Sequence, residues 1–190
     1  TFGVSWSLHP DETLMNQIHP VRYGSLDSYV IDLSGDAPPT ALAVLCHGYG
    51  APGSDLVGVV SEWVRLLESD AAKFRFLCPI APHSLAELGM PGGRAWWPLN
   101  MARMMQAIQA RRFDDLHNET PPGLDESRTA LSSLIVAARK ELAEQNSCST
   151  AAIPMALGGF SQGAMLTMDT ALRGDAGPPD YLMQFSGTVI

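Results

Sequence analysis

Residues 153–166 read IPMALGGFSQGAML, and this stretch indicates the fold more strongly than any other part of the chain. The apolar run at its start is typical of a buried strand, and apolar residues at helical spacing follow Gly163. A strand, a sharp turn and a helix in this order form the setting in which a strained turn raises a serine hydroxyl out of a sheet. We therefore interpret Ser161, at the centre of a G-x-S-x-G pentapeptide, as a candidate nucleophile.

The outer glycines of the pentapeptide have a physical reason to be glycine. A side chain at Gly159 or Gly163 would collide with the neighbouring strand or helix. The N-terminus of the helix that follows favours negative charge near Ser161. In the alternative interpretation, the glycines make an ordinary turn and Ser161 only caps the helix. The strand before the turn and the helix after it favour the nucleophile.

The rest of the chain alternates between predicted strands and helices. Residues 28–33, 41–46 and 74–79 are predicted strands, and 181–190 opens as another. Helices are predicted over 54–67, with Ser54 as the N-cap, over 101–108 and over 131–142. This alternation predicts an α/β fold with a mostly parallel sheet and helices on both faces. A chain of 190 residues, 46% of them hydrophobic, fits a single domain over residues 1–190.

Composition excludes several classes of partner. The formal net charge is −8 and no basic stripe is present, so we expect no nucleic-acid binding. No apolar run reaches the roughly 20 residues that a membrane span needs. The three cysteines are widely spaced and lack metal-ligand spacing, so we expect no metal site and a reducing, cytoplasmic location. No pattern specifies the oligomeric state.

A second glycine-containing motif supports the first. The apolar strand 41–46 runs into His47-Gly48-Tyr49-Gly50, at the place where a hydrolase of this fold needs a loop to aim a backbone N–H at a developing oxyanion. We predict that the two oxyanion donors are the backbone N–H groups of Tyr49 and Gln162.

Three motifs together resemble the phospholipase/carboxylesterase family of α/β-hydrolases, which includes the acyl-protein thioesterases. They are LCHGYG at 45–50, GRAWW at 93–97 and GFSQGAM at 159–165. The resemblance implies that Ser161 is the nucleophile and that Tyr49 and Gln162 supply oxyanion donors. It also implies cofactor-free hydrolysis of a small-molecule carboxylic ester or thioester through an acyl-enzyme. The sequence departs from the family at Tyr49, where leucine is more common. It also departs over residues 100–122, where the segment is longer than expected, and this bears on which length of acyl chain the protein prefers.

The chain does not supply a complete catalytic triad. The chain order in this fold is serine, then aspartate or glutamate, then histidine, and no histidine follows Ser161. Among the five histidines before it, His47 is a candidate base because its strand ends beside the elbow, but packing within the oxyanion loop is favoured. Members of the family that the chain resembles carry the Asp and a Gly-His pair in a C-terminal segment. We therefore expect the triad Asp and His, with the last strands and helices, beyond Ile190.

Other polar and aromatic residues allow two interpretations each. Arg94, Trp96 and Trp97 either line a substrate pocket, as an aromatic wall for an acyl or alcohol group, or anchor a long loop to the core. A methionine stripe is either an acyl groove or core. The carboxylates after Ser161 and those of the 125–144 region are expected to face solvent. The methionines are Met101, Met104 and Met105; the carboxylates are Asp169, Asp175, Asp180, Asp125, Glu126, Glu141 and Glu144.

Three functions are compatible with these patterns. The favoured one is a serine hydrolase that cleaves carboxylic esters or thioesters. A non-catalytic binding protein on a hydrolase fold is the second, because the chain lacks a general base after Ser161. A peptidase of the same fold is the third, and the Phe-Ser-Gln-Gly elbow disfavours it because it resembles the esterase branch.

Overall fold

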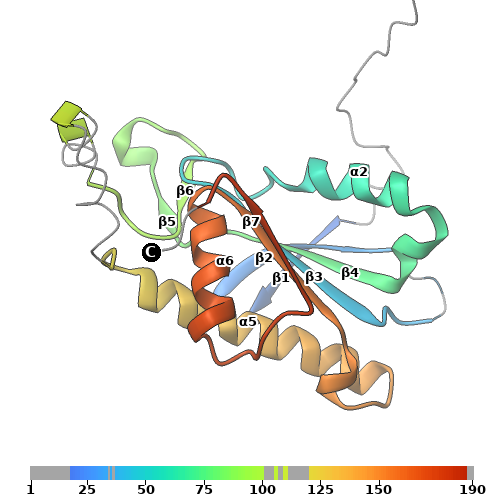
Figure 1. The fold of residues 1–190 in the computed structure, drawn as a ribbon. Helices are drawn as coiled ribbons and strands as arrows, with labels where there is room; N and C mark the ends of the chain where they lie inside the picture. The colour runs from blue at the N-terminus through green and yellow to red at the C-terminus, as the bar shows by residue number, and fades with distance from the viewer. Residues whose placement is uncertain are drawn as a thin grey trace, which may run out of the picture.

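The computed structural model describes residues 18–33, 35, 37–100, 105–106, 109–110 and 120–187. Within these ranges a six-stranded sheet has the order β1-β2-β4-β3-β7-β8 and lies between two helical layers (Figure 1). Helix α2 (Val57–Leu67) covers one face, and α5 (Leu124–Gln145) with α6 (Gln162–Arg173) covers the other. The strands are β1 (Ile18–Tyr23), β2 (Leu26–Asp32), β3 (Ala41–Cys46), β4 (Phe74–Pro79), β7 (Met155–Phe160) and β8 (Tyr181–Phe185).

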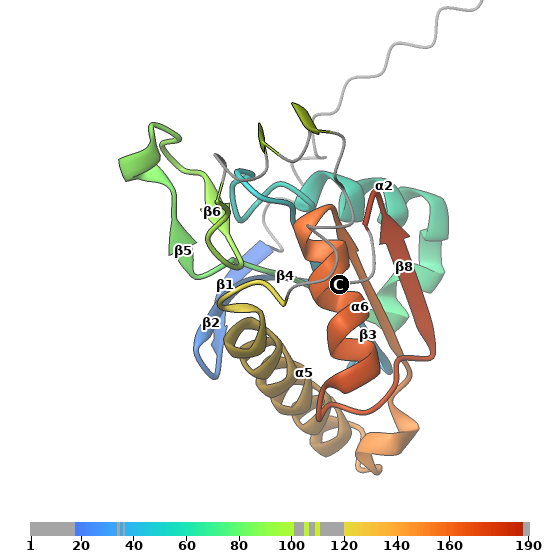
Figure 2. The same cartoon turned by 60° about the vertical axis from the view of Figure 1, so that its left-hand side comes forward.

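The pairing confirms the predicted mostly parallel sheet. Strands β4, β3, β7 and β8 run parallel, whereas β1 pairs antiparallel with β2 and β2 pairs antiparallel with β4. Strand β1 was not predicted, because it contains a polar pair and Pro20. A proline is tolerated there since β1 is an edge strand. At the opposite edge lies β8, and α6 contacts both β8 and α5 (Figure 2).

The two faces of the sheet bury separate apolar clusters. Strand β3 is buried at every position, as expected for a parallel strand covered on both sides. On the α2 side the cluster includes Leu45, Val60 and Phe76, and on the other side it includes Leu42, Leu157 and the inner faces of α5 and α6. The sheet is therefore held from both sides at the strands that carry the candidate loops.

Some helix boundaries differ from prediction. Helix α2 begins at Val57 with Leu56 as N-cap and no side-chain cap, so the prediction that Ser54 caps it is wrong. Helix α5 begins earlier than predicted, at Leu124, whose side chain is fully buried. The segment predicted as a loop between β4 and residue 98 contains a small ladder, β5 (His83–Ser84) with β6 (Arg94–Ala95). Short 3₁₀ turns are η1 (Glu68–Lys73), η2 (Ala86–Leu88) and η3 (Thr150–Ala152).

Part of the methionine stripe lies outside the described residues. Met101, Met104 and Ile108 belong to the undescribed positions, whereas Met105 is helical and 53% exposed. In the part of the chain that the structure describes, no helix has the length and apolar character needed to cross a bilayer.

A buried guanidinium links the sheet to α5. Arg75, on β4, donates to Asp32 at 2.9 Å and to Glu141 at 2.7 Å. Tyr23 also donates to Glu141 at 2.7 Å. Burial, together with this hydrogen bond, raises the pKa of Tyr23 to about 12. The prediction that Glu141 only faces solvent is therefore wrong, because partners distant in the sequence come to meet it.

We expect Arg75→Ala to lower the free energy of unfolding by about 3 kcal/mol, since the substitution leaves partly buried carboxylates without their cation. Arg65 forms an exposed pair with Glu62 at 2.8 Å and supplies the matched control. Arg65→Ala should change the stability by no more than about 0.5 kcal/mol. Urea unfolding followed by circular dichroism measures both changes. Equal losses of stability in the two variants would show that the buried pairs of Arg75 stabilise the fold no more than an exposed pair does.

Candidate active site

Ser161 occupies a strained position between a strand and a helix. It follows the last residue of β7 and precedes the first residue of α6, with φ 51° and ψ −114°. An L-residue rarely adopts this conformation, and it persists only where surrounding contacts fix it. The N–H of Ser161 donates to the carbonyl of Phe185 at 2.8 Å, and its carbonyl accepts from Met165 N–H at 3.0 Å. Both sides of the turn are thus held.

The flanking glycines are required by close backbone contacts. A Cβ at Gly159 would lie 2.4 Å from the carbonyl carbon of Gly163. A Cβ at Gly163 would lie 2.1 Å from the carbonyl oxygen of Cys46, at the end of β3. No side chain fits at these distances. The structure therefore agrees with the prediction that a side chain at either glycine would collide with a neighbouring segment.

The loop after β3 lies directly beside the serine. A Cβ at Gly48 would lie 3.4 Å from the Cβ of Ser161 and 3.1 Å from the Phe160 ring. Among the described residues, the backbone N–H groups of Tyr49 and Gln162 have no hydrogen-bond acceptor. An oxyanion hole requires two N–H groups that are free to donate to one oxygen beside the nucleophile. The N–H groups of Tyr49 and Gln162 are candidates for this role.

His47 holds this loop and is not placed to act on Ser161. The side chain is buried, and its Nε2 accepts from Ala81 N–H at 3.1 Å. Nδ1 therefore carries the proton and donates to the carbonyl of Gly48 at 2.8 Å. Burial lowers the pKa of His47. With both ring nitrogens engaged, the packing role is the one that the contacts support.

The structure places Trp96 and Trp97 inside the core. Their side chains are 0% and 1% exposed, so neither indole presents a face to a substrate. Trp96 Nε1 donates to the carbonyl of His47 at 2.8 Å. The Arg94 side chain is also engaged in a structural contact, because its Nε donates to the carbonyl of Ala81 at 2.7 Å. Of the two interpretations, the contacts support loop anchors.

The side chain of Gln162 was not singled out by sequence reasoning. Its Oε1 accepts from Trp96 N–H and its Nε2 donates to the carbonyl of Trp97, both at 2.9 Å. In the sequence, the only indication of a role for Gln162 was its position directly after the serine, and that position concerns its backbone N–H. The exposed Phe160 and Phe185 were missed as well; they pair across β7 and β8 and are 45% and 47% exposed beside the elbow.

Of the three carboxylates after the serine, Asp169 differs from expectation, whereas Asp175 and Asp180 are exposed as predicted. Asp169 was expected to face solvent, but it is 4% exposed because the face of α6 that carries it packs toward α5. It pairs there with Arg128 at 2.9 Å, and with Arg173 on its own helix. Asp175 and Asp180 are exposed, and Asp180 also accepts from Met155 N–H at 2.7 Å. Asp169 and Asp180 therefore have structural partners.

No histidine in the described part of the chain contacts the serine. His19 lies on β1, separated from β7 by three strands, and His83 lies on the small β5 strand. His9 and His117 lie outside the described residues. The Ser161 hydroxyl itself makes no hydrogen bond within the described residues.

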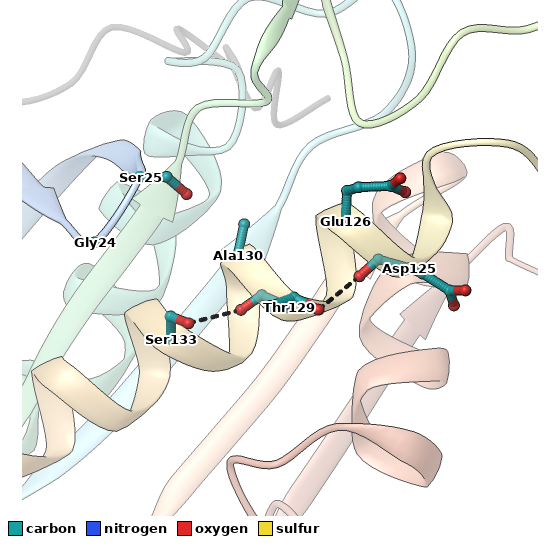
Figure 3. A pocket seen from close by; sticks show the side chains of 7 residues that line it. All are labelled: Gly24, Ser25, Asp125, Glu126, Thr129, Ala130 and Ser133. Atoms are coloured by element: carbon teal, nitrogen blue, oxygen red, sulfur yellow. Dashed lines mark hydrogen bonds between the residues drawn. The ribbon is translucent and has the colours of Figure 1, made fainter.

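Two buried thiols and a groove beside α5 are further features of the described residues. Cys46 and Cys78 are buried free thiols, and burial raises the pKa of Cys78 to about 12. A shallow groove of about 580 Å³ lies between the β1–β2 turn and α5 (Figure 3). The hydroxyls of Thr129 and Ser133 in that groove donate to carbonyls of their own helix, and no residue of the elbow lines it. We therefore place the candidate site at Ser161.

A model of the phospholipase/carboxylesterase family matches residues 29–190. The chain belongs to the phospholipase/carboxylesterase family. This confirms the resemblance carried by the three motifs, and solved structures agree on the fold. Esterase PE8 superimposes with a TM-score of 0.60 and 26% identity, over 87% of this chain and 65% of its own.

Two further solved structures show the likeness at lower identity. Acyl-protein thioesterase 2 of Zea mays has a TM-score of 0.42 and 21% identity, over 85% of this chain and 62% of its own. The siderophore hydrolase EstB of Aspergillus fumigatus has a TM-score of 0.50 and 10% identity, over 88% and 41%. The chain thus spans less than two thirds of the length of each of these three solved chains.

We expect Gly163→Ala to lower the free energy of unfolding by about 3 kcal/mol or more, because the new methyl group would overlap the Cys46 carbonyl. The control is Gly58→Ala in α2, where a Cβ meets nothing within 4 Å. That change should raise the stability by up to about 1 kcal/mol. Urea unfolding decides between them, and an unchanged midpoint for Gly163→Ala would contradict the close contact.

His47 should make stability dependent on pH. Its pKa is lowered by burial, so the folded protein binds fewer protons at this ring than the unfolded chain does. Acidification through the ordinary histidine pKa of about 6.5 therefore favours unfolding. We expect the unfolding free energy to decrease as the pH falls from about 7.5 to about 5.5. His47→Gln should flatten this dependence, while the exposed His83→Gln should retain it; an unchanged slope in His47→Gln would refute the assignment.

Proposed function

We propose that the whole protein hydrolyses carboxylic esters or thioesters through an acyl-enzyme on Ser161. The observation that carries the proposal is a strained serine at a strand–helix turn beside two backbone N–H groups that have no acceptor among the described residues. Membership of the phospholipase/carboxylesterase family supports it, as does the likeness to a structure named as an esterase. The substrate class is a small-molecule ester or acyl compound.

The proposed reaction has two halves. The Ser161 oxygen attacks the carbonyl carbon while its proton passes to a general base, and the carbonyl oxygen becomes an oxyanion. The N–H groups of Tyr49 and Gln162 donate to that oxyanion, and the N-terminus of α6 adds favourable charge. Collapse expels the alcohol or thiol, which takes up a proton. Water then attacks the acyl-enzyme, releasing the carboxylic acid and restoring the serine.

The general base is a further part of the proposal. No described histidine is positioned at Ser161, and His47 is committed to its loop. We assign the general base to a histidine of the whole protein that is oriented by a carboxylate. Its imidazole would accept the serine proton and return it to the leaving group.

The surroundings of the serine favour an apolar acyl group. Phe160 and Phe185 expose aromatic surface next to the elbow. We assign contact with the acyl chain to these two rings. Of the predicted pocket residues, Trp96 and Arg94 act in this proposal by holding the oxyanion loop: the buried Trp96 indole donates to the carbonyl of His47, and the Arg94 carbonyl accepts from Gly50 N–H. Trp97 is buried and contributes its carbonyl, which accepts from Gln162.

We expect the whole protein to be labelled by a fluorophosphonate probe and to hydrolyse p-nitrophenyl butyrate. Ser161→Ala should abolish labelling and lower kcat by about 10⁴-fold or more, because the nucleophile is lost. Ser133→Ala, on the exposed side of α5, should leave both unchanged.

Two results would contradict the proposal. Hydrolysis that persists in Ser161→Ala would place the nucleophile elsewhere. A wild-type protein that neither reacts with the probe nor turns over esters would favour a non-catalytic binding protein, and cleavage of peptides in preference to p-nitrophenyl esters would favour a peptidase.

A further inference from the structure

The two proposed oxyanion donors come from segments far apart in the sequence. Tyr49 follows β3, whereas Gln162 begins α6 after β7. Both N–H groups must reach one oxygen at hydrogen-bond distance, and a displacement of about 1 Å lowers a rate by about 100-fold. Some contact must therefore set the separation between the two segments.

The side chain of Gln162 begins such a contact. Gln162 is 3% exposed, and its carboxamide bonds to the backbone of two successive residues, accepting from Trp96 N–H and donating to the Trp97 carbonyl. A buried amide with both ends satisfied by the same short segment fixes that segment in position and orientation. The elbow is thereby tied to residues 94–97.

Residues 94–97 in turn hold the loop that carries Tyr49 on both sides. Before Tyr49, the indole of Trp96 donates to the carbonyl of His47 at 2.8 Å. After it, Gly50 N–H donates to the carbonyl of Arg94 at 2.9 Å. Tyr49 therefore lies between two residues that are both anchored to the segment that Gln162 grips.

Helix α5 provides a third support for the same segment. The Ser127 hydroxyl donates to the carbonyl of Trp96 at 2.6 Å and is itself buried. The backbone N–H and carbonyl of Trp96 are thus both bound by side chains, one from α6 and one from α5. Because side chains from two helices hold Trp96, the position of the Gln162 side chain determines the position of residues 94–97 and, through them, of the loop that carries Tyr49.

We propose that Gln162 is a positioning residue whose side chain, acting through Trp96, sets the separation between the two oxyanion donors; this inference rests on the proposed function. Gln162 then has two separable roles. Its N–H contacts the oxyanion, and its carboxamide places the N–H of Tyr49.

The test compares two variants that break different links with a matched control. Gln162→Met removes both carboxamide bonds at similar side-chain length, and Trp96→Phe removes only the bond to the His47 carbonyl. Gln184→Met makes the same exchange at a glutamine that bonds to Thr167 at 3.0 Å. With p-nitrophenyl butyrate and the whole protein, the first two should lower kcat about 10- to 100-fold with KM nearly unchanged, because the loss falls on the transition state. The control should retain both parameters.

A second measurement does not depend on turnover. The ¹⁵N–¹H resonance of Tyr49 should shift, and its amide should exchange faster, in Gln162→Met and in Trp96→Phe but not in Gln184→Met. If wild type hydrolyses no ester while this pattern appears, the proposed function fails and the positioning contact stands. If both variants match Gln184→Met in kcat and in the Tyr49 resonance, the inference is overturned. If Gln162→Met does not fold, the comparison of Trp96→Phe with Gln184→Met decides the test.

Discussion

The structure depends on the close approach of α6 to the end of β3. The backbone at Gly163 comes so near the Cys46 carbonyl that a methyl group would lie 2.1 Å from the oxygen. This contact brings the loop after β3 beside the turn that carries Ser161. Because the parallel register also aligns Cys46 with Gly159, both strands end at the same level and present their loops together. A single steric constraint thus assembles two motifs that are far apart in the chain.

The strained serine is supported by elements on either side of it. A non-glycine residue in this conformation costs about 1–3 kcal/mol, which the surrounding structure has to offset. Strand β8 contributes through the bond from Ser161 N–H to Phe185, and α6 contributes by packing against α5 within the larger apolar cluster. The edge strand therefore has a direct part in shaping the candidate site, although none of its side chains was predicted to belong to it.

The sequence predicted the features that depend on local pattern. The strained turn at Ser161 and the buried strand β3 follow from glycine positions and apolar runs within a few residues of each other. Contacts between distant segments escaped prediction. Glu141 and Asp169 were expected to face solvent because nothing nearby reveals Arg75 or Arg128 as their partners. The role of the Gln162 carboxamide was missed for the same reason, since its acceptor and donor lie on residues 96 and 97.

The burial of Trp96 also bears on how a family can vary its substrates. A loop that must place one N–H to within tenths of an ångström needs rigid support, and a buried indole with a satisfied N–H supplies it. A residue used in this way cannot change with the substrate without disturbing the N–H group that we propose as an oxyanion donor. Variation in acyl preference must then fall on side chains that touch the site without supporting it. Phe160 and Phe185, which expose their rings beside the serine, meet that requirement where Trp96 does not.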